Sequence, residues 1–283
     1  MIIFRKILPF AIMLLLLFSC ACITDDNTQN EGIGIIVSIP PFYEWVSAVG
    51  GDNVDITIMV PEGQSPHTYE PTPSQMVKVS KAQIWVKNGV GLEFWTDKIV
   101  EGNESINIID ISSGVDLIPL GDGYDPHIWL SLGIAKNAVE QIYDALVKID
   151  PENQEIYKNN MDSYLQRLDD VDELIVGTLG TESGKRFIVY HPAWSYFSRD
   201  YGLVQIPIQE GGNEPGPEGI TNIIDIARDY GIKVLFIEPQ FSTNDAKVIA
   251  NEIGGEVVAI NPLSSEYIDN CEKVARALVE GLA

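Results

Sequence analysis

Short apolar segments alternate with amphipathic ones along most of the chain. In the first half, "GIGIIVSI", "VDITIMV", "QIWVKN" and "SINIIDI" read as strands. The segments between them read as helices, as in "PFYEWVSAVGG", where proline stands at the start and glycine past the end. The same rhythm resumes with the strands "RFIVY", "LVQIPI", "IKVLFIE" and "EVVAI". Strands that alternate with helices in this way predict parallel sheets.

A different pattern separates the two series. From residue 152 to 179 the apolar residues recur at alternating steps of four and three, which places them in one stripe on a long helix: Tyr157, Met161, Tyr164, Leu168, Val171 and Ile175. Such a helix would be about 40 Å long. The other faces carry charges and amides, so we expect the helix to lie at the surface.

These patterns predict an α/β protein with two lobes, each with a mainly parallel sheet, bridged by one long rigid helix. We place the N-terminal lobe at residues 33–150, the linking helix at 151–181 and the C-terminal lobe at 182–283. The repeated Glu-Pro-x-Pro of "EPTPSQM" and "EPGPEGI" is a weak internal echo of the two lobes.

The first 32 residues read as a targeting segment and a tether. Arg5 and Lys6 precede the apolar run "ILPFAIMLLLLF", which is shorter than the roughly 20 residues of a membrane span. Cys20 follows "LFS" in a pattern that resembles a lipobox, and Cys22 is the alternative acylation site. We therefore expect a signal peptide with lipobox at 1–20, a tether at 21–32 and a lipid anchor in the cell membrane. An ordinary cleaved signal is the competing interpretation.

Composition narrows the class of function. The chain has 18 Lys and Arg against 41 Asp and Glu, a formal net charge of −23. This balance argues against nucleic acid as a partner, because phosphates require a basic surface. Of three cysteines, two lie at the processing site, which leaves Cys271 without an intramolecular disulfide partner.

The chain has three histidines, and each adjoins a proline: His67 in "SPHTY", His127 in "DPHIW" and His191 in "YHPAW". His67 and His191 also follow predicted strands, and ligands bind at the carboxyl ends of strands in open α/β sheets. The alternative to a shared site is that the three histidines lie in unrelated loops. If the three imidazoles converge, they form a partial shell for a metal such as Zn²⁺.

The sequence does not decide which group would be the fourth metal ligand. Glu238 in "FIEPQF", Asn261 in "AINPLS", Glu70 and water are the candidates, with Glu238 equally interpretable as a strand-end acid that caps the next helix. Asp125 and Glu70 are also candidates for orienting the imidazoles from outside the shell, by accepting the second ring N–H.

Four stretches together resemble the metal-binding lipoproteins of ABC importers that capture zinc or manganese. They are "SPHTYEPTPSQ", "DPHIWLS", "VYHPAWSYFSRDYGL" and "FIEPQFSTNDAKVIANEIGGEVVAINPL". The resemblance runs from about residue 33 to the end of the chain. It implies two α/β lobes with metal in the cleft between them, ligation by His67, His127 and His191, and an ABC permease with its ATPase subunit as partners.

The chain departs from that family pattern at two places. Asn261 stands where members often have an aspartate ligand, and the loop "IPLGDGYDPH" lacks the histidine-rich insertion of many zinc-specific members. Three nitrogen ligands without that aspartate favour Zn²⁺ over Mn²⁺, as does the segment "EPQFS".

We therefore expect a monomeric, extracytoplasmic, high-affinity Zn²⁺-binding protein, with Mn²⁺ as the alternative cargo, that is not an enzyme. A surface zinc hydrolase, an adhesin and a binder of siderophores or corrinoids are the competing hypotheses. No helical H-E-x-x-H motif supports the hydrolase.

Overall fold

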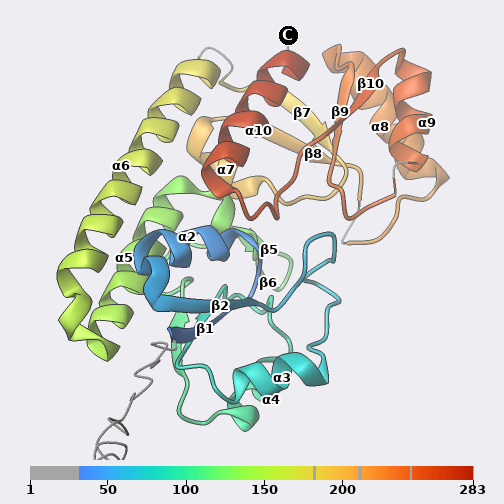
Figure 1. Ribbon diagram of the computed structural model, residues 1–283. Coiled ribbons are helices and arrows are strands. Elements are labelled where there is room, and N and C mark those ends of the chain that lie inside the picture. The colour runs from blue at the N-terminus through green and yellow to red at the C-terminus, as the bar shows by residue number, and fades with distance from the viewer. Residues whose placement is uncertain (1–31, 181–182, 210–211, 243, 283) are drawn as a thin grey trace, which may run out of the picture. The chain divides into compact units, whose positions relative to one another are not determined.

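Two four-stranded parallel sheets follow one another along the chain (Figure 1). The computed structural model describes residues 32–180, 183–209, 212–242 and 244–282. The expected signal peptide, Cys20, Cys22 and the tether up to residue 31 lie outside these described residues. We call residues 32–150 the N-terminal half and the described residues from 183 to 282 the C-terminal half.

The first sheet has the strand order β2-β1-β3-β4. These strands are β2 (Val54–Ile58), β1 (Ile33–Val37), β3 (Ile84–Lys87) and β4 (Asn107–Asp110). Ile35 of β1 pairs with Ile56 of β2 on one side and with Ile84 of β3 on the other. The helices of this half are α2 (Pro41–Gly50), α3 (Pro73–Val79), α4 (Thr96–Gly102) and α5 (Leu132–Ile149), with short 3-10 turns η1 (Gly51–Asn53) and η2 (Ile128–Leu130).

The second sheet has the order β10-β9-β7-β8. These strands are β10 (Glu256–Ala259), β9 (Val234–Ile237), β7 (Arg186–Val189) and β8 (Val204–Pro207). Its helices are α7 (Ser195–Tyr201), α8 (Pro217–Tyr230), α9 (Asn244–Ile253) and α10 (Tyr267–Leu282). Helix α8 shows how the sequence sets such bounds, because Pro217 opens it and Gly231, at φ 70°, ends it in the left-handed conformation.

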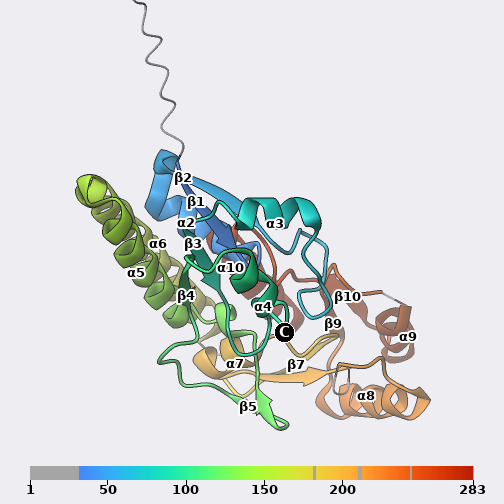
Figure 2. The same cartoon turned by 90° about the horizontal axis from the view of Figure 1, so that it is seen from below.

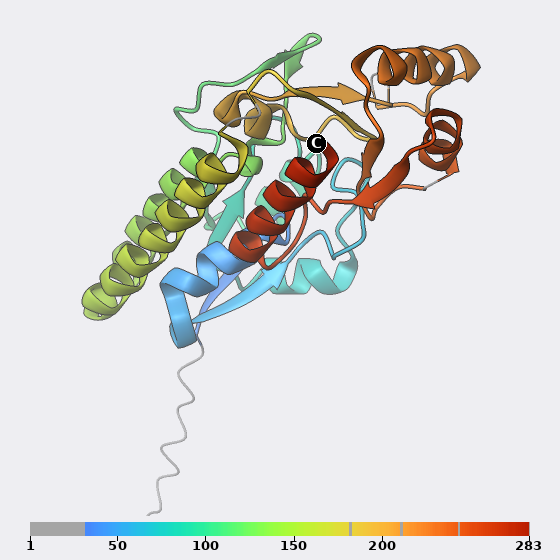
Figure 3. The same ribbon diagram turned by 90° about the horizontal axis from the view of Figure 1, so that it is seen from above.

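Helix α6 (Gln154–Leu179) follows the turn η3 (Pro151–Asn153) and connects the two series. All six residues of the predicted stripe are buried, and Leu179 extends it. The helix packs along α5, α10 and α2, so it contacts elements of both halves (Figures 1 and 3). Figure 2 shows α5 and α6 side by side along one flank of the sheets.

The fold-class prediction is confirmed: the protein is α/β, with two parallel sheets and one long helix. A single apolar core includes residues of both sheets and the buried stripe of α6. Because the described residues pack as one compact unit, the lobe boundaries at 150 and 182 stay predictions. Cys271 is a free, partly buried thiol. None of the helices in the described part of the chain is long and apolar enough to cross a membrane.

The structure differs from the sequence prediction around residues 88–124. The helix expected between the strands "QIWVKN" and "SINIIDI", in "GLEFWTDKIVE", begins only at Thr96. Gly89, Val90 and Gly91 all have positive φ, which interrupts helical geometry before that point. In the loop before His127, a two-stranded antiparallel hairpin of β5 (Pro119–Leu120) and β6 (Gly123–Tyr124) was not predicted.

Candidate metal centre

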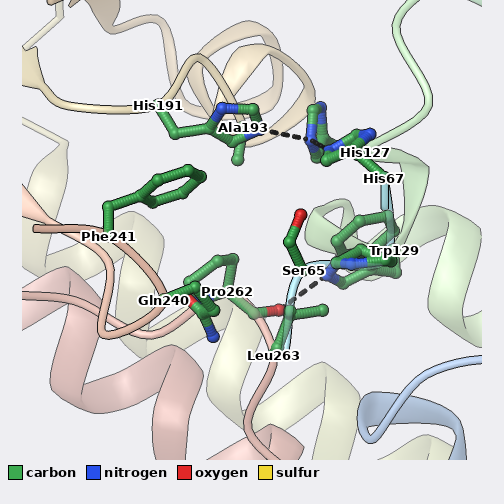
Figure 4. Close-up of a pocket in the computed structure, with 11 residues that line it drawn as sticks. Ser65, His67, His127, Trp129, His191, Ala193, Gln240, Phe241, Pro262 and Leu263 are labelled. Carbon is green, nitrogen blue, oxygen red and sulfur yellow. Dashed lines mark hydrogen bonds between the residues drawn. The ribbon is translucent and has the colours of Figure 1, made fainter. Parts of the chain in front are cut away.

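The three histidines meet at one point, although they come from distant parts of the chain (Figure 4). His67 lies in the loop between β2 and α3, His127 directly precedes η2, and His191 follows the end of β7. The Nε2 atom of His127 lies 3.2 Å from Nε2 of His67 and 3.1 Å from Nε2 of His191. The predicted convergence is therefore observed.

Two of the three nitrogen spacings fit a small tetrahedral ion, and all three ligand atoms lie within 4.8 Å of one another. Two imidazole nitrogens bound at 2.0–2.1 Å to a tetrahedral Zn²⁺ lie about 3.3 Å apart. The two Nε2–Nε2 distances are within a few tenths of an ångström of that value. Among the described residues, no other group of at least three His, Cys, Asp or Glu side chains brings its ligand atoms this close together.

Two of the rings are held in one orientation by a partner at the second nitrogen. Asp125 Oδ1 lies 2.7 Å from Nδ1 of His127 and also accepts the backbone N–H of His127. Gln209 Oε1 lies 2.8 Å from Nδ1 of His191, and the Gln209 side chain is buried. An acceptor at Nδ1 keeps the proton there, so Nε2 presents its lone pair to the cluster. Phe241 stacks on the His191 ring, which restrains it further.

The cluster favours neutral imidazoles. Burial and then the two neighbouring rings lower the pKa of His67 to about 3, and burial and then His127 lower the pKa of His191 to about 4. Since the His67 side chain is partly exposed, water relieves some of its burial, whereas repulsion between charged rings 3.2 Å apart would remain. For Asp125, burial raises the pKa, but the hydrogen bonds from His127 outweigh it, so the pKa is lowered.

Other residues singled out in the sequence have different partners. Glu238 is fully buried, but its carboxylate accepts from the backbone N–H of His191 and from Nε1 of Trp194, both at 3.2 Å. This geometry does not support Glu238 as the fourth ligand, because its oxygens are not among the ligand atoms that cluster with the three imidazole nitrogens. Burial raises the pKa of Glu238 to about 8.

Asn261 and Glu70 also stand apart from the cluster. Asn261 Oδ1 accepts from the backbone N–H of Leu263 and from Nε2 of Gln240. Glu70 forms an exposed ion pair with Lys98 at 2.6 Å. The Glu70 carboxylate therefore bonds to Lys98 and not, as one of the expectations had it, to an imidazole.

The cavity beside the three nitrogens is small and mainly apolar. Its volume is about 20 Å³, which is room for one water molecule. Its walls include Trp129, Phe241, Pro262 and Leu263, and the hydroxyl of Ser65 points into it (Figure 4). Sequence reasoning missed Gln209, Phe241 and Ser65. For Gln209 a signal existed, since it is a polar residue just past the strand "LVQIPI" at the edge where ligands bind.

Known proteins resemble this chain over most of its length. The family model described as "Zinc-uptake complex component A periplasmic" matches residues 35–281. The manganese-binding lipoprotein MntA of Halalkalibacterium halodurans is 32% identical over 97% of this chain and 97% of its own length. The high-affinity zinc uptake system protein ZnuA of Bacillus subtilis is 28% identical over 84% of this chain and 80% of its own length.

Solved structures agree with the sequence comparison. A crystal structure of ZnuA superposes with a TM-score of 0.87 at 35% identity and covers 89% of this chain and 100% of the ZnuA chain. The resemblance inferred from the four sequence stretches is thereby confirmed, and with it the prediction that the protein is a binding protein and not an enzyme. The chain belongs to the family of the periplasmic zinc-uptake complex component A, whose members are metal-binding components of uptake systems.

Proposed function

We propose that the protein captures Zn²⁺ outside the cytoplasm and delivers it to an ABC permease driven by an ATPase subunit. The observation that carries the proposal is the convergence of three Nε2 atoms, two of them separated from the third by 3.1 and 3.2 Å. His67, His127 and His191 are the proposed ligands, and Asp125 and Gln209 orient two of them. We propose water as the fourth ligand, since the cavity has room for one and the Ser65 hydroxyl points into it.

The ligand chemistry supports zinc rather than manganese. Imidazole nitrogens suit Zn²⁺, whereas Mn²⁺ prefers carboxylate, carbonyl and water oxygens. Among the described residues, no carboxylate joins the three histidines in the cluster. Relatives do not decide the question by name, because MntA is called manganese-binding and ZnuA a zinc uptake protein.

Affinity for nitrogen sites rises from Mn²⁺ to Zn²⁺ in any case, so the test concerns the metal that the protein carries in its own cells. We expect protein isolated from those cells, grown with both metals and purified without additions or chelators, to contain about one zinc ion per chain. Elemental analysis by mass spectrometry measures both metals at once. Stoichiometric manganese would contradict the zinc assignment, and the absence of any bound metal would contradict the carrier function itself.

Proton release on binding gives a second prediction. Three independent imidazoles with the ordinary pKa of about 6.5 would together release about two protons at pH 6.0 when a metal binds. Here the lowered pKa values keep His67 and His191 neutral at that pH, so we expect one proton or fewer. Titration calorimetry at pH 6.0 in buffers of different ionisation enthalpy measures this number. A release of two or more protons would show that the rings titrate independently.

For localisation we propose an extracytoplasmic protein anchored through a lipid on Cys20 or Cys22. The apolar N-terminal run with a lipobox-like sequence supports this, as does the name of MntA as a lipoprotein.

A further inference from the structure

The segment that carries His127 is attached to the C-terminal half of the protein as well as to its own half. Four hydrogen bonds join residues 125–131 to the C-terminal half: Tyr196 Oη to Asp125 O at 2.8 Å, Tyr267 Oη to Trp129 O at 2.7 Å, Trp129 Nε1 to Pro262 O at 2.7 Å, and Ser131 Oγ to Asp200 Oδ2 at 2.5 Å. The first three are buried. Although His127 precedes the long helix in sequence, its segment is bonded to the half that carries His191 as well as to Asn88 and Ile118 of its own half.

His67 is held far less firmly. It lies in the His67 loop, which we define as residues 61–72, between β2 and α3, and this loop contains no helix or strand. The His67 side chain is exposed, and among the described residues no group hydrogen bonds to its Nδ1. In contrast, Nδ1 of each of the other two rings has a buried partner. His67 is therefore the ligand with the fewest restraints.

One hydrogen bond ties the start of the His67 loop to the C-terminal half. Ser265 Oγ donates to Glu62 Oε1 at 2.6 Å, and both groups are exposed. Ser65, Pro66 and His67 line one side of the cavity, and Pro262 and Leu263 line the other. Figure 1 shows the loop between β2 and α3 extending toward the second sheet. The bond between Glu62 and Ser265 thus holds the loop over the cavity.

We infer that Glu62 and Ser265 are positioning residues that keep the His67 loop closed over the bound ion. This inference rests on the proposed function. Release then begins when the His67 loop opens, while the more firmly held His127 and His191 stay together. Because the hydrogen bond is exposed and joins one charged partner to one neutral partner, its loss should change the release rate by a modest factor, about three- to tenfold.

Zinc release into excess chelator, followed by stopped flow, tests the inference on the full chain. We expect Ser265→Ala and Glu62→Ala each to release Zn²⁺ about three- to tenfold faster than the unmodified protein, with the melting temperature of the metal-free protein unchanged. Ser265→Thr keeps a hydroxyl and should restore slow release. The double variant should be no faster than either single variant, because both remove the same bond.

Glu70→Ala is the matched control. Glu70 is an exposed carboxylate of the same loop, but its partner Lys98 lies in the N-terminal half. We expect Glu70→Ala to release zinc at the unmodified rate. Unchanged release from Ser265→Ala and Glu62→Ala, or equal acceleration by Glu70→Ala, would overturn the positioning role while leaving zinc capture intact. Failure of the unmodified protein to bind Zn²⁺ would overturn the proposed function together with this inference.

Discussion

The His127→Ala variant is expected to bind Zn²⁺ about 1000-fold more weakly than the unmodified protein. Structural zinc sites with four ligands gain roughly 10–16 kcal/mol from the metal, so one ligand accounts for about 2.5–4 kcal/mol, and a central ligand for a loss near the upper end, which approaches 1000-fold. His127 stands at the centre of the cluster, within 3.2 Å of both other Nε2 atoms. Its removal leaves His67 and His191 without the ring that each contacts most closely.

The three histidine variants should form a graded series. His191→Ala should lose about as much affinity as His127→Ala, because both rings are oriented by a buried partner. His67→Ala should lose about 100-fold, since the less restrained ring gives up more conformational freedom when it binds. Gln209→Ala, which removes only the partner of His191 Nδ1, should lose about tenfold.

Competition titration with a chromophoric chelator measures the whole series, and melting curves of the metal-free variants control for unfolding. Gln166→Ala is the control for the glutamine substitution, because Gln166 is exposed on α6 and its side chain hydrogen bonds, among the described residues, only to Asp170. It should bind zinc normally. Near-unmodified affinity in any histidine variant would remove that residue from the ligand set.

Hydrophobic periodicity was enough to predict the fold. The stripe from Tyr157 to Ile175 repeats over many turns and faces one surface, so the start of the long helix could be located within three residues. The strands could be predicted equally well, because they are short, mainly apolar runs bounded by turns. The three histidines could be grouped since the chain has no others and each adjoins a proline.

Contacts between distant side chains could not be predicted in the same way. Glu238 was a reasonable ligand candidate because it ends a strand at the binding edge. Only the three-dimensional structure shows that its oxygens accept hydrogen bonds from the His191 backbone N–H and from Trp194. Glu70 likewise forms an ion pair with Lys98, which lies 28 residues away in sequence. Such competition among partners depends on tertiary distances that no local pattern encodes.

The same limit explains the missed turn before α4. We expected helical structure from Gly91 onward, yet Gly89, Val90 and Gly91 all have positive φ, which excludes helical geometry at these three residues. Val90 has φ 54°, which is rare for a β-branched residue and costs of order 1–3 kcal/mol. A conformation of this kind persists only where surrounding contacts impose it, and here the buried Glu93 provides them.

Glu93→Ala is accordingly expected to reduce the free energy of unfolding by about 3–5 kcal/mol. The Glu93 carboxylate accepts from the backbone N–H groups of Asn88 at 2.6 Å and Gly89 at 3.1 Å, and Ser38 also bonds to it. Alanine would leave these donors buried without an acceptor, at about 1–3 kcal/mol each. Urea denaturation of the metal-free protein measures the loss. Glu93→Gln should lose less, since its amide oxygen can still accept.

The turn that Glu93 stabilises also supports the metal centre, so the same variant should affect binding. Asn88 Nδ2 donates to the carbonyl of Pro126, the residue before His127, at 2.9 Å. If the turn relaxes, His127 loses that support, and we expect Glu93→Ala to weaken Zn²⁺ binding about tenfold, as for other residues that orient a ligand indirectly. Glu104→Ala, an exposed substitution beyond α4, should change stability by less than about 0.5 kcal/mol and leave binding intact. A stability loss below 1 kcal/mol for Glu93→Ala would mean that the turn holds its strained form without the carboxylate, and the connection from Glu93 to His127 would fail with it.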